Sequence, residues 1–386
     1  MTIECSRRVN RVTPSATLSI STLAKELRAD GADVIDLSVG EPDFPTPAPI
    51  VEAGKTAMDA GHTGYTATTG VPELRRAIAD KLAEDGLGHD PDEIIVTPGA
   101  KQALYETIQT LVDDGDEVTL LDPAWVSYEA MVKLAGGTLS RVDLSPFGFG
   151  LADGGLDALA AAISDETEVL IVNSPSNPSG IVYGVEALEG VRDLAVEHDV
   201  TVISDEIYER ITYGDSPPSL GSLDGMADRT VTVNGFSKAY SMTGWRLGYL
   251  AGPSSVIEQA SKLHSHSVSC ATNFVQRAGI VALEDVDEPI DEMVRAFERR
   301  RDLLVDRLRD AGVELPRTPE GAFYLMVPVV GDDQQTCENA LADQHVATVP
   351  GSAFGTPGYA RISYATDVAR IETAVDRLLK TDFFER

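Results

Sequence analysis

The chain has 386 residues, enough for two or three domains with a large core. It carries 62 acidic and 31 basic residues, a formal net charge of −31, and only eight of the basic residues are lysines. A surface this negative repels nucleic acid and anionic membranes, which excludes both as partners. Because the acids are spread along the chain, we interpret them as a surface adapted to high salt; recognition of a cationic partner is the alternative.

Hydrophobic residues make up 43% of the chain, without a continuous run near the roughly 18 residues that a membrane span requires. Residues 1–30 also lack the apolar core of a signal peptide, so we expect the protein to be cytoplasmic. The three cysteines, Cys5, Cys270 and Cys337, are widely spaced. They predict neither a disulfide framework nor a zinc site.

Short apolar runs alternate with segments of helical pattern through the first three quarters of the chain. The runs cover residues 93–99, 117–122, 168–173, 200–206, 230–235 and 246–252. Such alternation predicts an α/β domain with a mostly parallel sheet. Ligands in these sheets bind beyond the carboxyl ends of the strands, so residues that follow the apolar runs are the candidates for a site.

The pattern changes after about residue 285. A long charged helix is predicted over residues 289–312, followed by apolar segments at 321–328 and 360–365. This succession predicts a smaller α+β domain after the α/β domain. Neither an internal repeat nor a low-complexity linker separates the two, so we expect them to pack closely.

The most informative motif is GFSKAYSMTGWRLG at residues 235–248, directly after one of the apolar runs. A lysine that forms an imine needs a tight, partly dry pocket that lowers its pKa, and Lys238 lies among small and hydroxyl residues. Arg246 and the serine hydroxyls are suited to binding a phosphate ester. Together they indicate an aldehyde cofactor that carries a phosphate, and pyridoxal 5′-phosphate is the candidate.

This motif resembles the lysine signature of the class I aminotransferases, in the fold-type I group of pyridoxal-phosphate enzymes. Eight further segments match that family in order: LSVGEPDFPTP (37–47), GYTATTGVPELRRAIA (64–79), TPGAKQAL (97–104), DPAWVSY (122–128), NSPSNPSG (173–180), SDEIYER (204–210), GAFYLM (321–326) and VPGSAFG with ARISYAT (349–366). They cover nearly the whole chain, and the sequence is most similar to the prokaryotic aspartate aminotransferases.

The resemblance implies the architecture and the assembly. It implies a large cofactor-binding domain at residues 40–285, and a small domain built from residues 1–39 and 286–386. It also implies a homodimer with shared active sites, in which Tyr65 binds the phosphate of the partner subunit. From its sequence context alone, Tyr65 is an ordinary loop aromatic.

The resemblance also assigns the cofactor-binding residues. Lys238 forms the imine and moves protons, and Asp205 keeps the ring nitrogen protonated; from its sequence alone, Asp205 could instead cap a helix. Asn177 and Tyr208 donate to the cofactor's phenolate oxygen, although Asn177-Pro178 also reads as a turn. The residues implied for the phosphate are Gly99, Ala100, Lys101, Ser237 and Arg246.

For the substrate, the resemblance implies that Arg361 forms a forked pair with the α-carboxylate and that the backbone of Gly40 approaches it. Trp125 is implied to stack on the cofactor ring, with a core tryptophan as the alternative, and it joins Asn177 in contacting the substrate. Lys101 matches the lysine implicated in binding a second carboxylate. His264 and His266 could be read as metal ligands, but two histidines are a weak signal, and we expect no metal.

These expectations favour an aminotransferase that converts L-aspartate and 2-oxoglutarate to oxaloacetate and L-glutamate. The alternative is an aminotransferase for prephenate, aromatic or alanine-type substrates. The same fold also hosts lyases and synthases, and fold alone does not fix the reaction. A ligand-sensing domain of a regulator would need an added DNA-binding module, for which the length and charge leave no room.

Overall fold

The computed structural model describes residues 4–14, 16–284 and 286–386. Its largest element is a seven-stranded sheet with the order β2-β8-β7-β6-β5-β3-β4. β8 is antiparallel to both neighbours and the other neighbouring strands are parallel, which confirms a mostly parallel sheet. The strands are β2 (Ile94–Thr97), β3 (Glu117–Asp122), β4 (Thr138–Asp143), β5 (Thr167–Asn173), β6 (Thr201–Asp205), β7 (Thr230–Gly235) and β8 (Gly248–Ala251).

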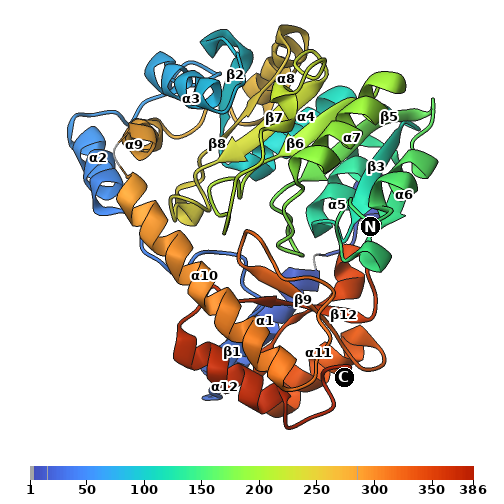
Figure 1. Ribbon diagram of the computed structural model, residues 1–386. Coiled ribbons are helices and arrows are strands. Elements are labelled where there is room, and N and C mark those ends of the chain that lie inside the picture. Colours follow the sequence, from blue (N-terminus) through green and yellow to red (C-terminus); the bar gives the residue numbers. More distant parts are fainter. Residues whose placement is uncertain (1–3, 15, 285) are drawn as a thin grey trace.

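Helices cover both faces of this sheet, so its central strands are apolar on both sides (Figure 1). In β5, Val169 and Ile171 pack in one core with α4, α5 and α8, whereas Leu170 and Val172 pack in another core with α6 and α7. These helices are α4 (Ala100–Leu111), α5 (Val126–Ala135), α6 (Gly155–Ala162), α7 (Val185–Glu197) and α8 (Ser254–Ser267). Because successive side chains of a strand point to opposite faces, alternate residues of β5 pack in different cores.

A long helix joins the two regions of the molecule. In Figure 1, α10 runs from the upper region, beside α2 and α9, down across the lower region. Its buried positions recur at helical spacing, as in Ile290, Met293 and Phe297, which turns one apolar face to the core. The helices in this part of the molecule are α2 (Ala48–Asp59), α3 (Pro72–Glu84), α9 (Asn273–Glu284) and α10 (Asp287–Asp310).

The lower region holds two small sheets. One is antiparallel, in the order β11-β12-β9, and the other pairs β1 with β10 in parallel. The elements of this region are α1 (Ala16–Ala29), β1 (Ile35–Asp36), β9 (Tyr324–Pro328), α11 (Asp333–Gln344), β10 (Val346–Ala347), β11 (Val349–Pro350), β12 (Tyr359–Ser363) and α12 (Val368–Leu378). Short 3-10 helices are η1 (Val9–Arg11), η2 (Pro91–Glu93), η3 (Ser145–Phe147), η4 (Leu220–Ser222), η5 (Thr243–Trp245) and η6 (Gly351–Phe354).

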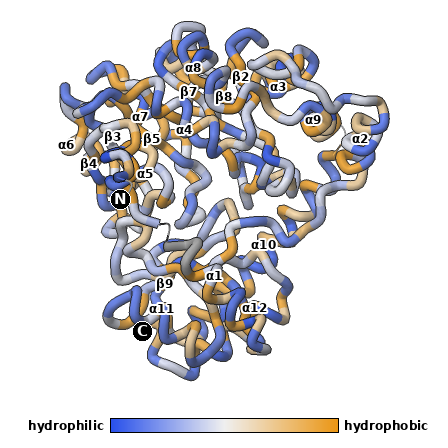
Figure 2. Tube along the Cα trace, turned by 180° about the vertical axis from the view of Figure 1, so that it is seen from behind, coloured by the Kyte–Doolittle hydropathy of each residue, from blue (hydrophilic) through white to orange (hydrophobic). Residues whose placement is uncertain are grey.

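The two regions share one apolar core, which includes Val231 of β7, Phe297 of α10 and Ile362 of β12. Hydrophilic stretches lie along the outer helices and turns (Figure 2). Because β1 pairs with β10, we propose that residues 1–39 and 286–386 form the small domain and residues 40–285 the large one. Residues 1–3, 15 and 285 lie outside the described residues. None of the described helices is long and apolar enough to cross a membrane.

Candidate active site

A cleft of about 730 Å³ opens where β5, β6 and β7 end, between the large sheet and the three-stranded β11-β12-β9 sheet. Six cationic side chains line it, against three carboxylates. The cations are Lys25, Arg28, Lys101, Lys238, Arg246 and Arg361, and the carboxylates are Asp36, Glu41 and Asp205. In a chain of net charge −31, this local excess of cations marks a site for anions.

Lys238 follows β7, and its Nζ donates a hydrogen bond to the carbonyl oxygen of Gly40. Nζ also lies 5.6 Å from the centre of the Tyr208 ring and 5.9 Å from that of Phe323. Burial lowers the pKa of Lys238 to about 8, and the positive charge of Arg361 acts in the same direction. The amine is therefore available in its neutral, nucleophilic form at mildly alkaline pH.

Asp205 is the last residue of β6, in register with Asn173 at the end of β5. Its Oδ2 accepts a hydrogen bond of 2.5 Å from the Tyr128 hydroxyl, and its Oδ1 accepts from the Ile207 backbone N–H. Burial raises the pKa of Asp205 to about 6. The chain makes a turn over residues 207–210, so the alternative reading of Asp205 as a helix cap is wrong.

Arg361 of β12 is a fully buried cation, with 2% of its surface exposed. Its guanidinium lies 4.5 Å from the Tyr324 ring centre and 5.1 Å from that of Phe354. Nη1 donates to Asn177 Oδ1 at 2.9 Å, and Nη2 donates to the carbonyl of Ser38 at 2.6 Å. Among the described residues, no carboxylate is within ion-pair distance and no acceptor meets Nε. A buried guanidinium left in this state is suited to receiving a carboxylate.

Two predicted hydrogen-bond donors lie close to Arg361. The Tyr208 hydroxyl is 2.9 Å from the Tyr324 hydroxyl, and burial raises the pKa of both phenols. The Oδ1 of Asn177 is occupied by Arg361, which leaves its Nδ2 as the donor end of the amide. Both residues line the cleft, so the structure brings them together with Lys238 and Asp205.

The start of α4 forms the other end of the cleft. Gly99 precedes the helix with φ of 89°, and a Cβ atom built there would lie 2.5 Å from Nη2 of Arg246. The positive φ favours glycine here, and Nη2 of Arg246 donates to the Pro98 carbonyl beside the helix start. Ser237 and Ala100 line the same end. A helix N-terminus, a hydroxyl and an arginine fit a phosphate group.

Lys101 and Trp125 lie on the side wall of the cleft. Nζ of Lys101 is 4.7 Å from the Trp125 ring centre, and the pKa of Lys101 is lowered by desolvation and by the charge of Arg246. Within the described part of the chain, no carboxylate pairs with this ammonium group. The ammonium group of Lys101 is thus placed to pair with an anion in the cleft.

Tyr65 is a predicted site residue that does not reach this cleft. It is 91% exposed, on a loop that Asn273 and Gln276 hold through hydrogen bonds of 3.1 Å to Gly64 and Thr66. Exposure of this kind is what a contact with a second subunit requires. Its role on a partner's phosphate stays a prediction.

Four further residues form hydrogen bonds with the predicted site residues, although the sequence did not single them out. They are Ser38, Tyr128, Asn173 and Tyr324. Asn173 donates to the Asp205 carbonyl and accepts from the Asn177 N–H, so it ties β5 to β6 beside the cleft. All four stand inside the segments that carry the family resemblance, which was the available signal.

His264 pairs with a buried carboxylate. Its Nδ1 lies 2.8 Å from Glu106 Oε2, with both side chains fully buried between α4 and α8. Gln102 and Ser267 donate to the same carboxylate. Among the residues that the structure describes, no group of three His, Cys, Asp or Glu side chains is placed to hold a metal.

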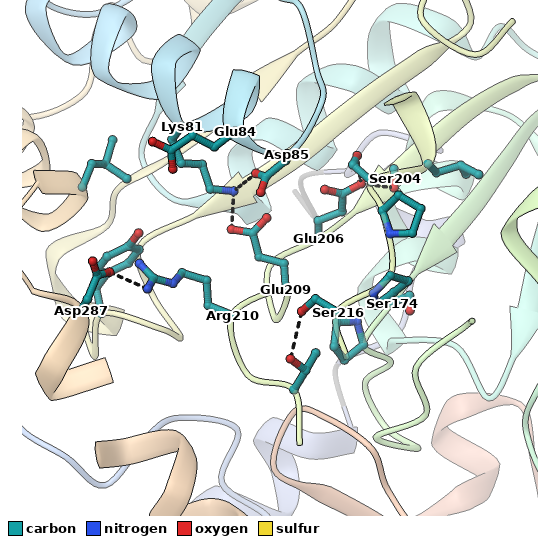
Figure 3. Close-up of a pocket in the computed structure, with 18 of the residues that line it drawn as sticks. Lys81, Glu84, Asp85, Ser174, Ser204, Glu206, Glu209, Arg210, Ser216 and Asp287 are labelled. Atoms are coloured by element: carbon teal, nitrogen blue, oxygen red, sulfur yellow. Dashed lines mark hydrogen bonds and ion pairs between the residues drawn. The ribbon is translucent and has the colours of Figure 1, made fainter. Parts of the chain in front are cut away.

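A second cavity, of about 970 Å³, lies on the opposite face of β6 and is drawn in Figure 3. Ser204 and Glu206 line it, whereas Asp205 between them lines the cleft. Two cations and eight carboxylates border this cavity. They are Lys81 and Arg210, and Asp80, Glu84, Asp85, Glu206, Glu209, Glu284, Asp287 and Asp291. Burial raises the pKa of Glu206 to about 7, and its Oε1 accepts from two serine hydroxyls.

Comparison with known proteins identifies the family of this chain. Residues 32–378 match the family model for aminotransferases of class I and II. The chain is 43% identical to the aspartate aminotransferase of Geobacillus stearothermophilus, over 97% of this chain and 98% of the relative. It is 42% identical to an aspartate/prephenate aminotransferase of Thermus thermophilus, with the same coverage.

The structure is also similar to solved ones. The aspartate aminotransferase from Thermus thermophilus with maleate superimposes with a TM-score of 0.94, at 40% identity, over 98% of this chain and all of the other. The match to the family model and to full-length relatives shows that this chain belongs to the class I and II aminotransferases.

Proposed function

We propose that the protein uses pyridoxal 5′-phosphate to convert L-aspartate and 2-oxoglutarate to oxaloacetate and L-glutamate. The observation that carries the proposal is a lysine with a lowered pKa and a buried carboxylate with a raised pKa, together in a cationic cleft. When bound, pyridoxal phosphate supplies an aldehyde for the amino group and a ring that withdraws electrons from the carbon attached to that group.

The side chains that would hold the cofactor come from several strand ends. Lys238 would bind its aldehyde carbon covalently, and Asp205 would pair with the ring nitrogen. Asn177 Nδ2 and the Tyr208 hydroxyl would donate to the ring oxygen, and Trp125 would cover the ring. The start of α4, Ser237 and Arg246 would hold the phosphate. This arrangement is supported by the burial of Asp205 and by the glycine that admits Arg246.

The substrate is held and deprotonated by the remaining groups. Arg361 receives the α-carboxylate, which supplies the anion that this buried guanidinium lacks within the chain. Gly40 lies beside Lys238, because its carbonyl accepts from Nζ, and its backbone would approach the same carboxylate. The neutral Lys238 amine would take the proton from the substrate α-carbon and deliver it to the cofactor carbon that carried the aldehyde.

Preference for a diacid is proposed on Lys101. A four- or five-carbon diacid places a second carboxylate away from Arg361, and Lys101 offers an unpaired charge on the cleft wall. Relatives named for aspartate support this choice. Prephenate, also a diacid, is the alternative amino acceptor, and relatives in Thermus and Aquifex are named for both substrates.

We also propose a homodimer in which Tyr65 reaches the phosphate of the partner subunit. Its 91% exposure and its anchored loop support this assignment. Light scattering on the active enzyme checks it. A monomer with full activity would contradict the shared site.

Half-reactions of the purified holoenzyme test the function. The absorbance of the bound cofactor is followed while aspartate, glutamate, alanine or phenylalanine is added, at low and at molar salt. We expect low concentrations of aspartate and glutamate to convert the bound cofactor, and the same concentrations of alanine and phenylalanine to leave it unchanged. Comparing prephenate with 2-oxoglutarate as the second substrate then tests the alternative amino acceptor. A spectrum that no amino acid changes would contradict the aminotransferase proposal.

A further inference from the structure

The charge of Arg361 must be stabilised before a substrate arrives. Its guanidinium is buried under two aromatic rings, and its direct hydrogen-bond acceptors are neutral oxygens of Asn177 and Ser38. A buried cation is costly unless the hydrogen bonds that it makes have good geometry, so its acceptors must be held in place. Burial lowers the pKa of Arg361, and the negative charge of Asp36 is among the groups that counteract this shift.

Asp36 reaches Arg361 through a single residue. The Asp36 Oδ1 accepts hydrogen bonds from the backbone N–H of Ser38 at 3.1 Å and from its hydroxyl at 2.5 Å. The carbonyl of the same serine accepts from Arg361 Nη2 at 2.6 Å. The carboxylate therefore closes a turn over residues 36–38, and the Ser38 carbonyl of this turn points toward the guanidinium.

The rest of this turn is held by backbone pairing. Asp36 is the last residue of β1, and Leu37 donates to Ala347 and accepts from Ser363, two residues past Arg361 on β12. On the solvent side, Arg28 of α1 lies 3.5 Å from Asp36 Oδ2 and balances its charge. The side chain of Asp36 is only 5% exposed, so its interactions are weakly screened by solvent.

We propose that Asp36 is a positioning residue for Arg361: it holds the Ser38 carbonyl in place and thereby fixes the guanidinium that receives the α-carboxylate. The inference rests on the proposed role of Arg361. Every amino acid and oxo acid in the reaction carries this carboxylate, so loss of Asp36 weakens all substrates alike. Loss of Lys101, in contrast, weakens the diacids selectively.

Three variants test the proposal in the full-length holoenzyme. Asp36→Ala removes the acceptor, whereas Asp36→Asn keeps an oxygen in the same place and loses the charge. Asp30→Ala is the matched control, because Asp30 is an exposed acid at the end of α1 that does not line the cleft. We expect Asp36→Ala to raise KM for aspartate, glutamate and 2-oxoglutarate by about tenfold each, with kcat changed much less. Asp36→Asn should restore KM to near the wild-type value.

Maleate binding, followed by calorimetry, gives a readout that does not depend on turnover. We expect Kd to rise about tenfold in Asp36→Ala, and to stay near wild type in Asp36→Asn and in Asp30→Ala. If Asp36→Ala does not fold, Ser38→Ala replaces it, since it removes one of the two hydrogen bonds to Asp36, and about a threefold rise is expected.

The outcomes separate the two claims. Unchanged maleate binding in Asp36→Ala, or in Ser38→Ala where that variant stands in, overturns the positioning role, and so does an Asp36→Asn variant as weak as Asp36→Ala. A wild-type enzyme that binds maleate and does not transaminate instead contradicts the proposed function and leaves the positioning test intact.

Discussion

The two cavities on either side of β6 contrast in charge although they share one strand. The cleft on the Asp205 side is bordered by six cations and three carboxylates, and the cavity on the Glu206 side by two cations and eight carboxylates. Burial raises the pKa of both neighbouring acids, Asp205 to about 6 and Glu206 to about 7. Desolvation thus acts similarly on both faces, and it does not distinguish the candidate active site.

The lysines distinguish the two cavities. Lys81, beside the acidic cavity, pairs with Asp85 at 2.8 Å and with Glu209, and these carboxylates raise its pKa although burial opposes them. Lys238 has no carboxylate within ion-pair distance among the described residues, and its pKa falls to about 8. Without a carboxylate partner, burial lowers the pKa of a lysine and makes its neutral, reactive amine accessible. With carboxylate partners, the pKa stays high and the lysine remains an unreactive cation.

Substitution of each lysine in turn should give the largest difference between the two cavities. We expect Lys238→Ala to lower transamination by at least about a thousandfold, because the covalent attachment and the proton carrier are lost together. Lys81→Met should keep kcat within about threefold and lower Tm, because Asp85 and Glu209 lose their partner. Normal turnover in Lys238→Ala, measured beside Lys81→Met, would contradict the assignment of the site.

The pH dependence of cofactor capture gives the next largest effect. Only the neutral amine of Lys238 attacks an aldehyde, and the protonated fraction grows below the pKa of about 8. When the cofactor-free protein is mixed with pyridoxal phosphate, the rate should fall about tenfold per pH unit below 7 and level off above 8. A rate that does not change between pH 6 and pH 8.5 would show that the lysine is not titrating there.

Lys101 tests the cationic wall of the cleft. Lys101→Ser should lower kcat/KM for aspartate and glutamate by about 10- to 100-fold, roughly 1.4–2.7 kcal/mol, because the second carboxylate loses its partner. Monocarboxylic amino acids such as alanine should change much less. Equal losses for both kinds of substrate would mean that Lys101 serves the cofactor or the fold.

Glu206 gives the smallest effect and concerns the acidic cavity. With its folded pKa raised to about 7, the native protein binds an extra proton between about pH 4.5 and 7, so this carboxyl contributes stability at low pH that is lost as the pH rises. The Tm of Glu206→Gln relative to wild type should therefore increase by a few degrees from pH 5 to pH 8, at fixed salt. A difference in Tm that does not vary with pH would place the Glu206 pKa near its usual value.

Much of the site could be predicted from the sequence because its residues follow strand ends. Asp205 lies at the end of one apolar run and Lys238 shortly after another, and the carboxyl ends of parallel strands meet at one edge of a sheet. The direction of β8 could not be predicted, since a run of four apolar residues has the same pattern in either orientation. It pairs antiparallel with β2 and β7.

The contacts made across long stretches of chain were beyond sequence reasoning. The hydroxyls of Tyr208 and Tyr324 meet at 2.9 Å although 116 residues separate them. Asp36 lies one residue before the segment that resembles the family, so its link to Arg361 through Ser38 appears only in three dimensions. The alternation of β6 predicts that Glu206 faces away from Asp205, but it does not predict a cavity there.

Reduction of the holoenzyme with borohydride, followed by peptide mass mapping, tests the central claim most directly. Reduction fixes the cofactor permanently to the amine that holds it. We predict one pyridoxyl group per chain, on the peptide that contains Lys238, with Lys81 and Lys101 unmodified. A group on another lysine, or a native protein that takes up no cofactor, would contradict the account.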